Sequence, residues 1–202
     1  MLRCVITDRT LFPGEEDSQR QSLLLRQVAL WAHRGMDLIQ LREKDLNPGD
    51  IAELAGRILH IISAASSPTR LLINGSLQAA TESRAHGVHL PSRSPLLPDD
   101  VRRRYAALEL PSPIVTVSCH TLAEIQIACR NRADAILFAP VFGKTVSDRL
   151  VTPAAGLERL REACTAADPI PVYALGGVTE QNAAQCLAMG AKGVAGIRLF
   201  IG

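Results

Sequence analysis

A run of polar residues at positions 40–45, Gln-Leu-Arg-Glu-Lys-Asp, directly follows an apolar segment. Alternate side chains of an extended backbone share one face, so we expect Gln40, Arg42 and Lys44 to lie together. Two cations and an amide on one face suit an anion such as phosphate or carboxylate. The alternative is a solvated loop in which Arg42 pairs with Glu43 or Asp45. The apolar segment before the run favours the anion site.

A second polar group, Ser118-Cys119-His120, also ends an apolar run. Neighbours on a strand face opposite sides, so Ser118 and His120 point one way and Cys119 the other, which argues against a Cys-His nucleophile pair. Imidazole titrates near neutral pH, and His120 is therefore a candidate general acid/base. The alternative is a histidine that caps the helix expected after it.

Two glycine-bearing segments, at Gly176-Gly177 and at Gly196-Ile197-Arg198, follow the last two apolar runs of the chain. Glycine lets backbone N–H groups approach a phosphate closely, so Gly176, Gly177, Ile197 and Arg198 are candidate phosphate-binding residues. Asn74, at the end of another apolar run, and Lys144, in a later polar segment, are further candidates for substrate binding.

Short apolar runs that alternate with amphipathic stretches must position these residues. The runs are apolar on both faces, as in buried parallel strands. They predict strands at 3–7, 37–41, 70–74, 87–90, 113–118, 134–139, 171–175 and 193–197. The stretches between them predict helices at 18–33, 48–64, 122–132, 153–166 and 179–189, with Asn47-Pro48 and Thr152-Pro153 as helix starts and Gly35 and Gly190 as helix ends.

Eight strands with helices between them favour a closed (β/α)8 barrel, also called a TIM barrel, over an open sheet. The active site of such a barrel lies at the C-terminal ends of its strands, where the polar groups above are found. We expect a single domain over residues 1–202. The sequence stops at Gly202, just after the eighth strand, so the final helix is expected to be missing and a partner subunit could cover that side.

Composition excludes several classes of function. A formal net charge of +2 gives no reason to expect nucleic acid or a membrane as partner, and no apolar stretch approaches the roughly 18–20 residues of a membrane span. No signal peptide is recognisable. The five cysteines include no C-x-x-C pair, which indicates reduced thiols in a cytoplasmic protein and no zinc site.

Taken together, the motifs resemble those of the thiamine phosphate synthase superfamily, in the family's order and over nearly the whole chain. The matching segments are 39–45 (Ile-Gln-Leu-Arg-Glu-Lys-Asp), 72–74 (Leu-Ile-Asn), 87–90 (Gly-Val-His-Leu), 118–120 (Ser-Cys-His), 138–142 (Phe-Ala-Pro-Val-Phe) and 174–177 (Ala-Leu-Gly-Gly). The resemblance implies a small phosphorylated thiazole as substrate and a homodimer. It also implies one of two activities: a synthase that joins a pyrimidine pyrophosphate to thiazole phosphate with magnesium, or a metal-free thiazole tautomerase of the TenI branch.

Departures from the synthase pattern favour the tautomerase. The synthases have Asn-Asp after the third strand, and here the pair is Asn74-Gly75; their aspartate after the fourth strand is replaced by Ser94. Those carboxylates hold the magnesium, a cation that needs oxygen ligands. Two further features depart from a close match: Arg198 stands where the family has a serine after the eighth strand, and Gln40 and Lys44 are more synthase-like than tautomerase-like.

We therefore expect an isomerase without cofactor, in which His120 moves a proton, Arg42 and Lys44 hold the substrate carboxylate, and Ser118 and Asn74 position the ring. The alternative is a thiamine-phosphate synthase that uses Mg²⁺ through relocated ligands. A second alternative is a barrel that binds the ligand without catalysis, because one fold hosts many chemistries.

Overall fold

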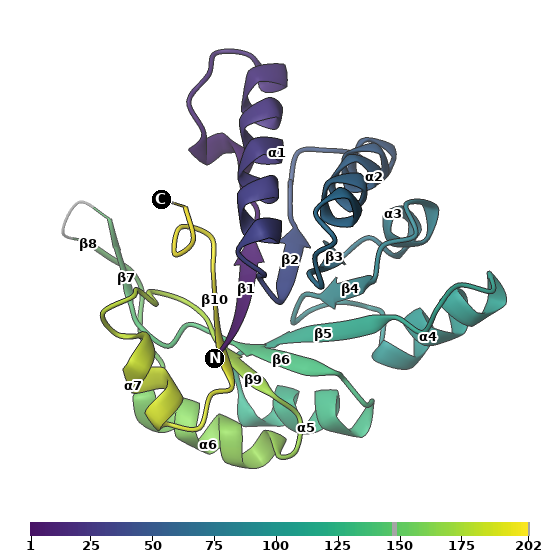
Figure 1. Cartoon of the computed structure of the whole chain (residues 1–202). Coiled ribbons are helices and arrows are strands. Elements are labelled where there is room, and N and C mark those ends of the chain that lie inside the picture. Colours follow the sequence, from purple (N-terminus) through teal and green to yellow (C-terminus); the bar gives the residue numbers. More distant parts are fainter. Residues whose placement is uncertain (147–148, 202) are drawn as a thin grey trace.

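The structure, a computed structural model, describes the backbone of residues 1–146 and 149–201 and the side chains of residues 1–143 and 153–201. Eight parallel strands close into a barrel in which the first and last strands are neighbours (Figure 1). In chain order they are β1 (Leu2–Ile6), β2 (Leu38–Leu41), β3 (Arg70–Asn74), β4 (Gly87–Leu90), β5 (Ile114–Cys119), β6 (Ala135–Phe138), β9 (Val172–Ala174) and β10 (Gly193–Gly196). The predicted TIM barrel is confirmed.

Helices surround the barrel and cover the outer faces of its strands (Figure 1). They are α1 (Asp17–His33), α2 (Pro48–Ala64), α3 (Leu77–Glu82), α4 (Pro98–Ala107), α5 (Leu122–Arg130), α6 (Leu157–Ala167) and α7 (Ala183–Ala188), with a 3₁₀ turn, η1 (Arg9–Leu11), after β1. The side chain of Asn47 accepts a hydrogen bond from the backbone of Asp50 and caps α2, as predicted. Gly35 and Gly190 adopt the positive φ angles expected where helices end.

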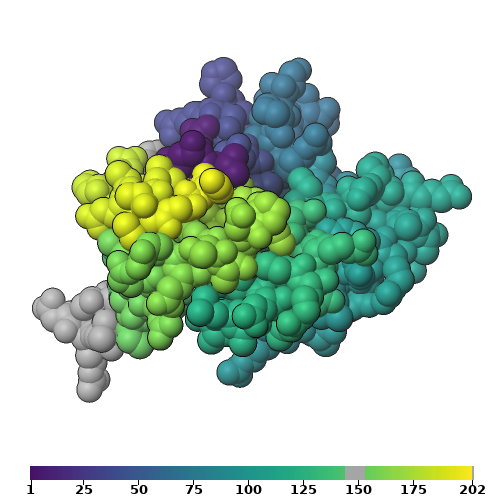
Figure 2. Space-filling view, turned by 90° about the horizontal axis from the view of Figure 1, so that it is seen from below, coloured from purple at the N-terminus to yellow at the C-terminus, as the bar shows by residue number. Residues whose placement is uncertain are grey.

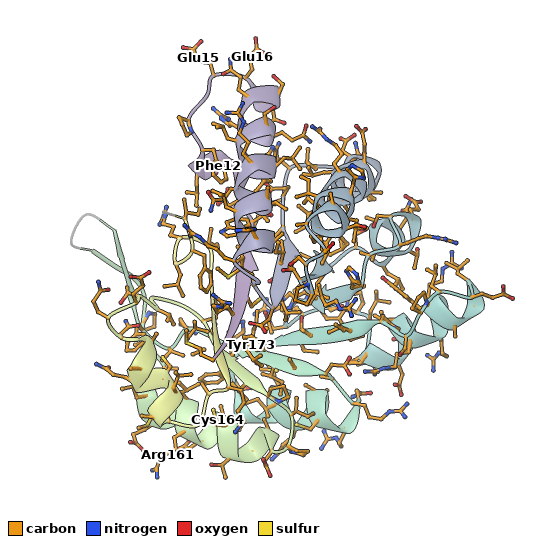
Figure 3. The ribbon with its side chains drawn as sticks, in the orientation of Figure 1. Phe12, Glu15, Glu16, Arg161, Cys164 and Tyr173 are labelled. Carbon is orange, nitrogen blue, oxygen red and sulfur yellow. The ribbon has the colours of Figure 1, made fainter. Side chains whose placement is uncertain are left out.

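Inside the barrel, buried side chains from several strands form one cluster (Cys4, Ile6, Leu38, Leu72, Ala135, Leu137, Tyr173 and Ala195). Tyr173 lies near the centre of Figure 3 and is 3% exposed. Two larger clusters of buried side chains lie between the strands and the helices. Active sites of such barrels lie at the end where the strands finish, and the polar residues described below are found there.

Two helix starts were predicted four residues too early: the helix predicted at 179–189 is α7, which begins at Ala183, and the helix predicted at 153–166 begins later as well. Residues Arg149–Thr152 form β8, which pairs antiparallel with β7 (Lys144–Val146), and α6 begins at Leu157. The pair Thr152-Pro153 therefore ends a strand and does not begin a helix. Gly156 stands before α6 with a φ of +91°, a conformation that glycine adopts without strain.

No helix follows β10 within the described residues. The final segment turns back beside α1, where the indole N–H of Trp31 donates to the carbonyl of Phe200 at 2.8 Å. Figure 2 shows this segment (yellow) beside the N-terminal residues (purple) on one face. None of the helices in the described part is both long and apolar enough to cross a membrane.

Candidate functional site

The polar residues inside the barrel lie at the C-terminal ends of β2, β3, β4 and β5. Gln40, 2% exposed, donates a hydrogen bond from Nε2 to Oδ1 of Asn74 at 2.9 Å. Its Oε1 is buried and has no partner. A buried amide oxygen without a partner costs free energy, so Gln40 presents an unused acceptor at the barrel mouth.

His89, on β4, is an ionisable group buried inside the barrel, at 3% exposed. Its Nδ1 is 2.8 Å from Oγ1 of Thr116, and its Nε2 is 2.9 Å from Oγ of Ser118. Burial first, and then the charge of Arg42, lower the pKa of His89 to about 3. His89 is therefore neutral at physiological pH and fixes the hydroxyl of Ser118.

Arg42 directly follows β2 and is half-buried, and its charge adds to burial in lowering the pKa of His89. The face predicted for Gln40, Arg42 and Lys44 stays a prediction for Arg42. It is wrong for Lys44, because β2 ends at Leu41 and Lys44 lies exposed in a turn.

Arg9, in η1, binds the carboxylates next to Arg42. Its side chain is 3% exposed and forms ion pairs with Asp17 at 2.8 Å, Glu43 at 3.1 Å and Asp45 at 2.6 Å. Hydrogen bonds with Asp45 raise the pKa of Arg9, and the same contact lowers the pKa of Asp45. The alternative in which Arg42 pairs with Glu43 or Asp45 is therefore not what the structure shows.

His120 is exposed, and its Nδ1 lies 2.6 Å from the carbonyl oxygen of Ala139. A carbonyl only accepts, so Nδ1 carries the proton and Nε2 of the neutral ring has a free lone pair. The cap of α5 is Thr121, which exchanges hydrogen bonds with Glu124. The side chain of His120 thus does not cap the helix, and beside it lies an open cavity of about 420 Å³.

Cys119 lies on the other side of β5, in the cluster between strands and helices, as the alternation of side chains predicts. Burial raises the pKa of its thiol to about 12. A thiol that stays protonated at neutral pH is a poor nucleophile.

Gly176 and Gly177 follow β9, with φ angles of +92° and +65°. A Cβ atom on Gly176 would lie 2.8 Å from Cα of Pro140, and one on Gly177 would lie 2.7 Å from Cβ of Phe142. Both glycines are therefore required by contact with the segment after β6. Among the described residues, no acceptor takes a hydrogen bond from the backbone N–H of Gly177, Ile197 or Arg198, which leaves these amides available to an anion.

Replacing Gly177 with alanine should destabilise the protein by roughly 2–4 kcal/mol, through the left-handed backbone and the clash with Phe142. Gly35→Ala is the matched control, since Gly35 has a φ of +62° and nothing within 4 Å of its Cβ position. It should cost about 1–2 kcal/mol. Urea unfolding of both variants measures the difference, and equal losses would show that the contact with Phe142 contributes nothing.

Two predicted residues remain apart from this group. Arg198 is exposed in the turn after β10, where its backbone carbonyl accepts from Ile201. The backbone of Lys144 belongs to β7, and its side chain lies outside the described residues. Their binding roles stay predictions, as do those of Gln40, Arg42 and Asn74.

Comparisons with known proteins agree with this barrel. The family model described as thiamine monophosphate synthase matches residues 4–200. A thiamine-phosphate synthase of Methanoculleus marisnigri is 32% identical over 198 residues, which cover 98% of this chain and 86% of that protein. One of Roseiflexus castenholzii is 35% identical over 168 residues, 83% of this chain and 70% of that protein. The solved structure of a thiamine phosphate pyrophosphorylase from Pyrococcus furiosus has a TM-score of 0.75 at 24% identity and covers 98% of this chain and 85% of that one.

Proposed function

The chain belongs to the thiamine monophosphate synthase family, and from this premise we propose that it is a metal-independent thiazole tautomerase. Its substrate would be a thiazole carboxylate phosphate, in which one proton moves between ring positions and the ring becomes aromatic. The observation that supports this choice is the free Nε2 of His120, whose Nδ1–H is held by the carbonyl of Ala139, together with the binding of Glu43 and Asp45 by Arg9.

The donors at the mouth do not fit magnesium. Of the two positions where the synthases have aspartates, one is Gly75, which has no side-chain ligand, and at the other Oγ of Ser94 accepts from the backbone N–H of Leu96. The neighbouring Asn74 accepts a hydrogen bond from Gln40 with its Oδ1. Within the part of the chain whose side chains are described, no three His, Cys, Asp or Glu side chains are grouped as a metal site. Magnesium prefers carboxylates among its protein ligands, so we derive no step through a metal.

In the proposed reaction, Nε2 of His120 takes the proton from the substrate and returns it to another ring position. The carbonyl of Ala139 holds Nδ1–H throughout and stabilises the imidazolium that forms in between. Ser118, held by His89, and Asn74, held by Gln40, would contact the ring. No proton is gained or lost overall.

Anionic groups of the substrate would be held at two places. Arg42 would bind the carboxylate, with Lys44 nearby in sequence. The free amides after β9 and β10, at Gly177, Ile197 and Arg198, would bind the phosphate, as loops after the last two strands of such barrels commonly do.

The second candidate is a thiamine-phosphate synthase, which the names of the relatives favour. The deciding assay offers purified protein the pyrimidine pyrophosphate, thiazole phosphate and magnesium, and measures pyrophosphate release. A parallel assay follows conversion of the thiazole carboxylate phosphate by NMR, with and without EDTA.

We expect conversion that EDTA leaves unchanged, and no release of pyrophosphate when a known synthase releases it under the same conditions. Magnesium-dependent release would make the protein a synthase. Ligand binding with neither activity would identify a binding protein. A homodimer stays a prediction from the family resemblance, and light scattering of the purified protein measures it.

A further inference from the structure

Charges alternate along residues 42–45 in the order Arg, Glu, Lys, Asp, so each cation has an anion beside it in sequence. Such a segment would ordinarily neutralise itself and leave no cation for a ligand. In the structure, both carboxylates turn to Arg9 instead. Neither Arg42 nor Lys44 pairs with a carboxylate among the side chains that the structure describes.

The geometry of Arg9 explains why an arginine is needed there. All five N–H groups of its guanidinium are used: Nε and one Nη2 proton on Asp17, the two Nη1 protons on Glu43 and Asp45, and the second Nη2 proton on Asp45. A lysine has only three donors and no planar fork, so it could not hold three carboxylates at once.

Glu43 joins this cluster to the backbone of Arg42. Its Oε1 accepts from the hydroxyl of Thr7 at 2.6 Å, and that hydroxyl accepts from the backbone N–H of Arg42 at 2.9 Å. Its Oε2 accepts from the backbone N–H of Arg9 at 3.0 Å. The side chain of Glu43 is 2% exposed, whereas those of Asp17 and Asp45 are 57% and 64% exposed and are screened by water. The contact between Arg9 and Glu43 is therefore the buried one of the three, and it is linked through Thr7 to the backbone of Arg42.

We infer that Arg9 is a positioning residue: by holding Glu43 and Asp45 on the outer side of the end of β2, it keeps the Arg42 guanidinium unpaired and directed to the mouth for an anionic group of the substrate. Without Arg9, the buried carboxylate of Glu43 has no cation. Of its two cationic neighbours in sequence, Lys44 is exposed, whereas Arg42 is half-buried and its backbone is already linked to Glu43 through Thr7. The inference rests on the proposed function, in which Arg42 binds the substrate carboxylate.

The test compares two aromatic ligands that differ only in that carboxylate: the aromatic thiazole carboxylate phosphate, which is the product of the proposed reaction, and thiazole phosphate. Calorimetric titration gives both dissociation constants, and their ratio isolates the contribution of Arg42. In the wild type we expect the carboxylate to tighten binding by about 10- to 100-fold. Arg9→Gln should reduce this ratio to about threefold or less. Arg9→Lys should also reduce it, because a lysine holds fewer of the carboxylates.

A triple variant shows whether a lowered ratio in Arg9→Gln comes from the freed carboxylates pairing with Arg42 or from damage to the local structure. With Arg9→Gln, Glu43→Gln and Asp45→Asn together, no anion remains to compete for Arg42, so the ratio should return to near the wild-type value. Arg102→Gln is the matched control: Arg102, on α4, pairs with Asp99 of the same helix and with Asp134 before β6, and its loss should not change the ratio.

Should Arg9→Gln fail to fold, Thr7→Val tests the same link, since it removes the hydroxyl between Arg42 and Glu43 and keeps the side-chain volume. It should lower the ratio, and Thr7→Ser should keep it. Thr69→Val is the control, because Thr69 is an equally buried threonine whose hydroxyl donates to Met36 at the other end of the barrel.

An unchanged ratio in Arg9→Gln, or in Thr7→Val where that is the variant used, would overturn the inference while leaving the proposed function intact. A ratio that stays low in the triple variant would also overturn it, because the carboxylates would then not be the cause. A wild-type ratio near one would remove the carboxylate role proposed for Arg42, and the inference with it.

Discussion

Turnover should fall by about 100- to 10,000-fold when His120 is replaced by alanine, the range typical for loss of a general acid/base. The imidazole is exposed, and its hydrogen bond to the carbonyl of Ala139 can be replaced by water. The midpoint of thermal unfolding should therefore move by no more than a few degrees. The KM should change little, because the proposed anion-binding groups are Arg42 and the backbone amides after β9 and β10.

His60→Ala is the matched control for this experiment. His60 is an exposed histidine on α2, away from the polar residues of the barrel mouth, and its loss should leave the rate of tautomerisation as in the wild type. Rates for both variants come from the NMR conversion assay at saturating substrate. Unchanged turnover in His120→Ala would end the assignment of this histidine as the base, whichever thiazole phosphate is the substrate.

The barrel itself could be predicted from the sequence because its signal is local. Each strand is a short run that is apolar on both faces, and two of the strands, Arg70–Asn74 and Gly87–Leu90, have the predicted bounds. The hairpin of β7 and β8 was not predicted. Its strands are only three and four residues long, and Thr152-Pro153 matches the pattern of a helix start.

The site was predicted where it depends on position along a strand and not where it depends on distant partners. Gln40, Asn74 and Ser118 end strands, and they meet at the mouth for that reason alone. His89 was not among the predicted site residues. A polar residue within a buried run must find hydrogen-bond partners, and that requirement points to the barrel interior.

Arg9 was missed because its partners lie 8 to 36 residues away along the chain. The polar residues Thr7, Asp8 and Arg9 at the end of the first strand carry the same end-of-strand signal as Arg42. No pattern in the sequence shows which cation pairs with which carboxylate. That choice follows from the closed barrel, which brings the ends of β1 and β2 together.

Acid should destabilise this protein well above the pH at which carboxylates titrate, because of His89. Its pKa is about 3 when folded and about 6.5 in an unfolded chain. Below pH 6.5 the unfolded chain therefore gains a proton that the folded protein does not. The contribution of His89 to stability is complete above pH 6.5 and is lost as the pH falls toward 3, at up to about 1.4 kcal/mol per pH unit.

His89→Gln removes this titration, and an amide can still hydrogen-bond to Thr116 or Ser118. The free energy of unfolding, measured in urea between pH 7 and 4.5, should fall much less steeply in this variant than in the wild type. Some slope should remain, because burial first, and then the charge of Arg70, lower the pKa of His86 as well. His60→Gln, at an exposed histidine, should keep the wild-type slope. Equal slopes in His89→Gln and the wild type would mean that His89 takes up its proton in the folded barrel. The inference that a neutral His89 fixes the hydroxyl of Ser118 would then be wrong.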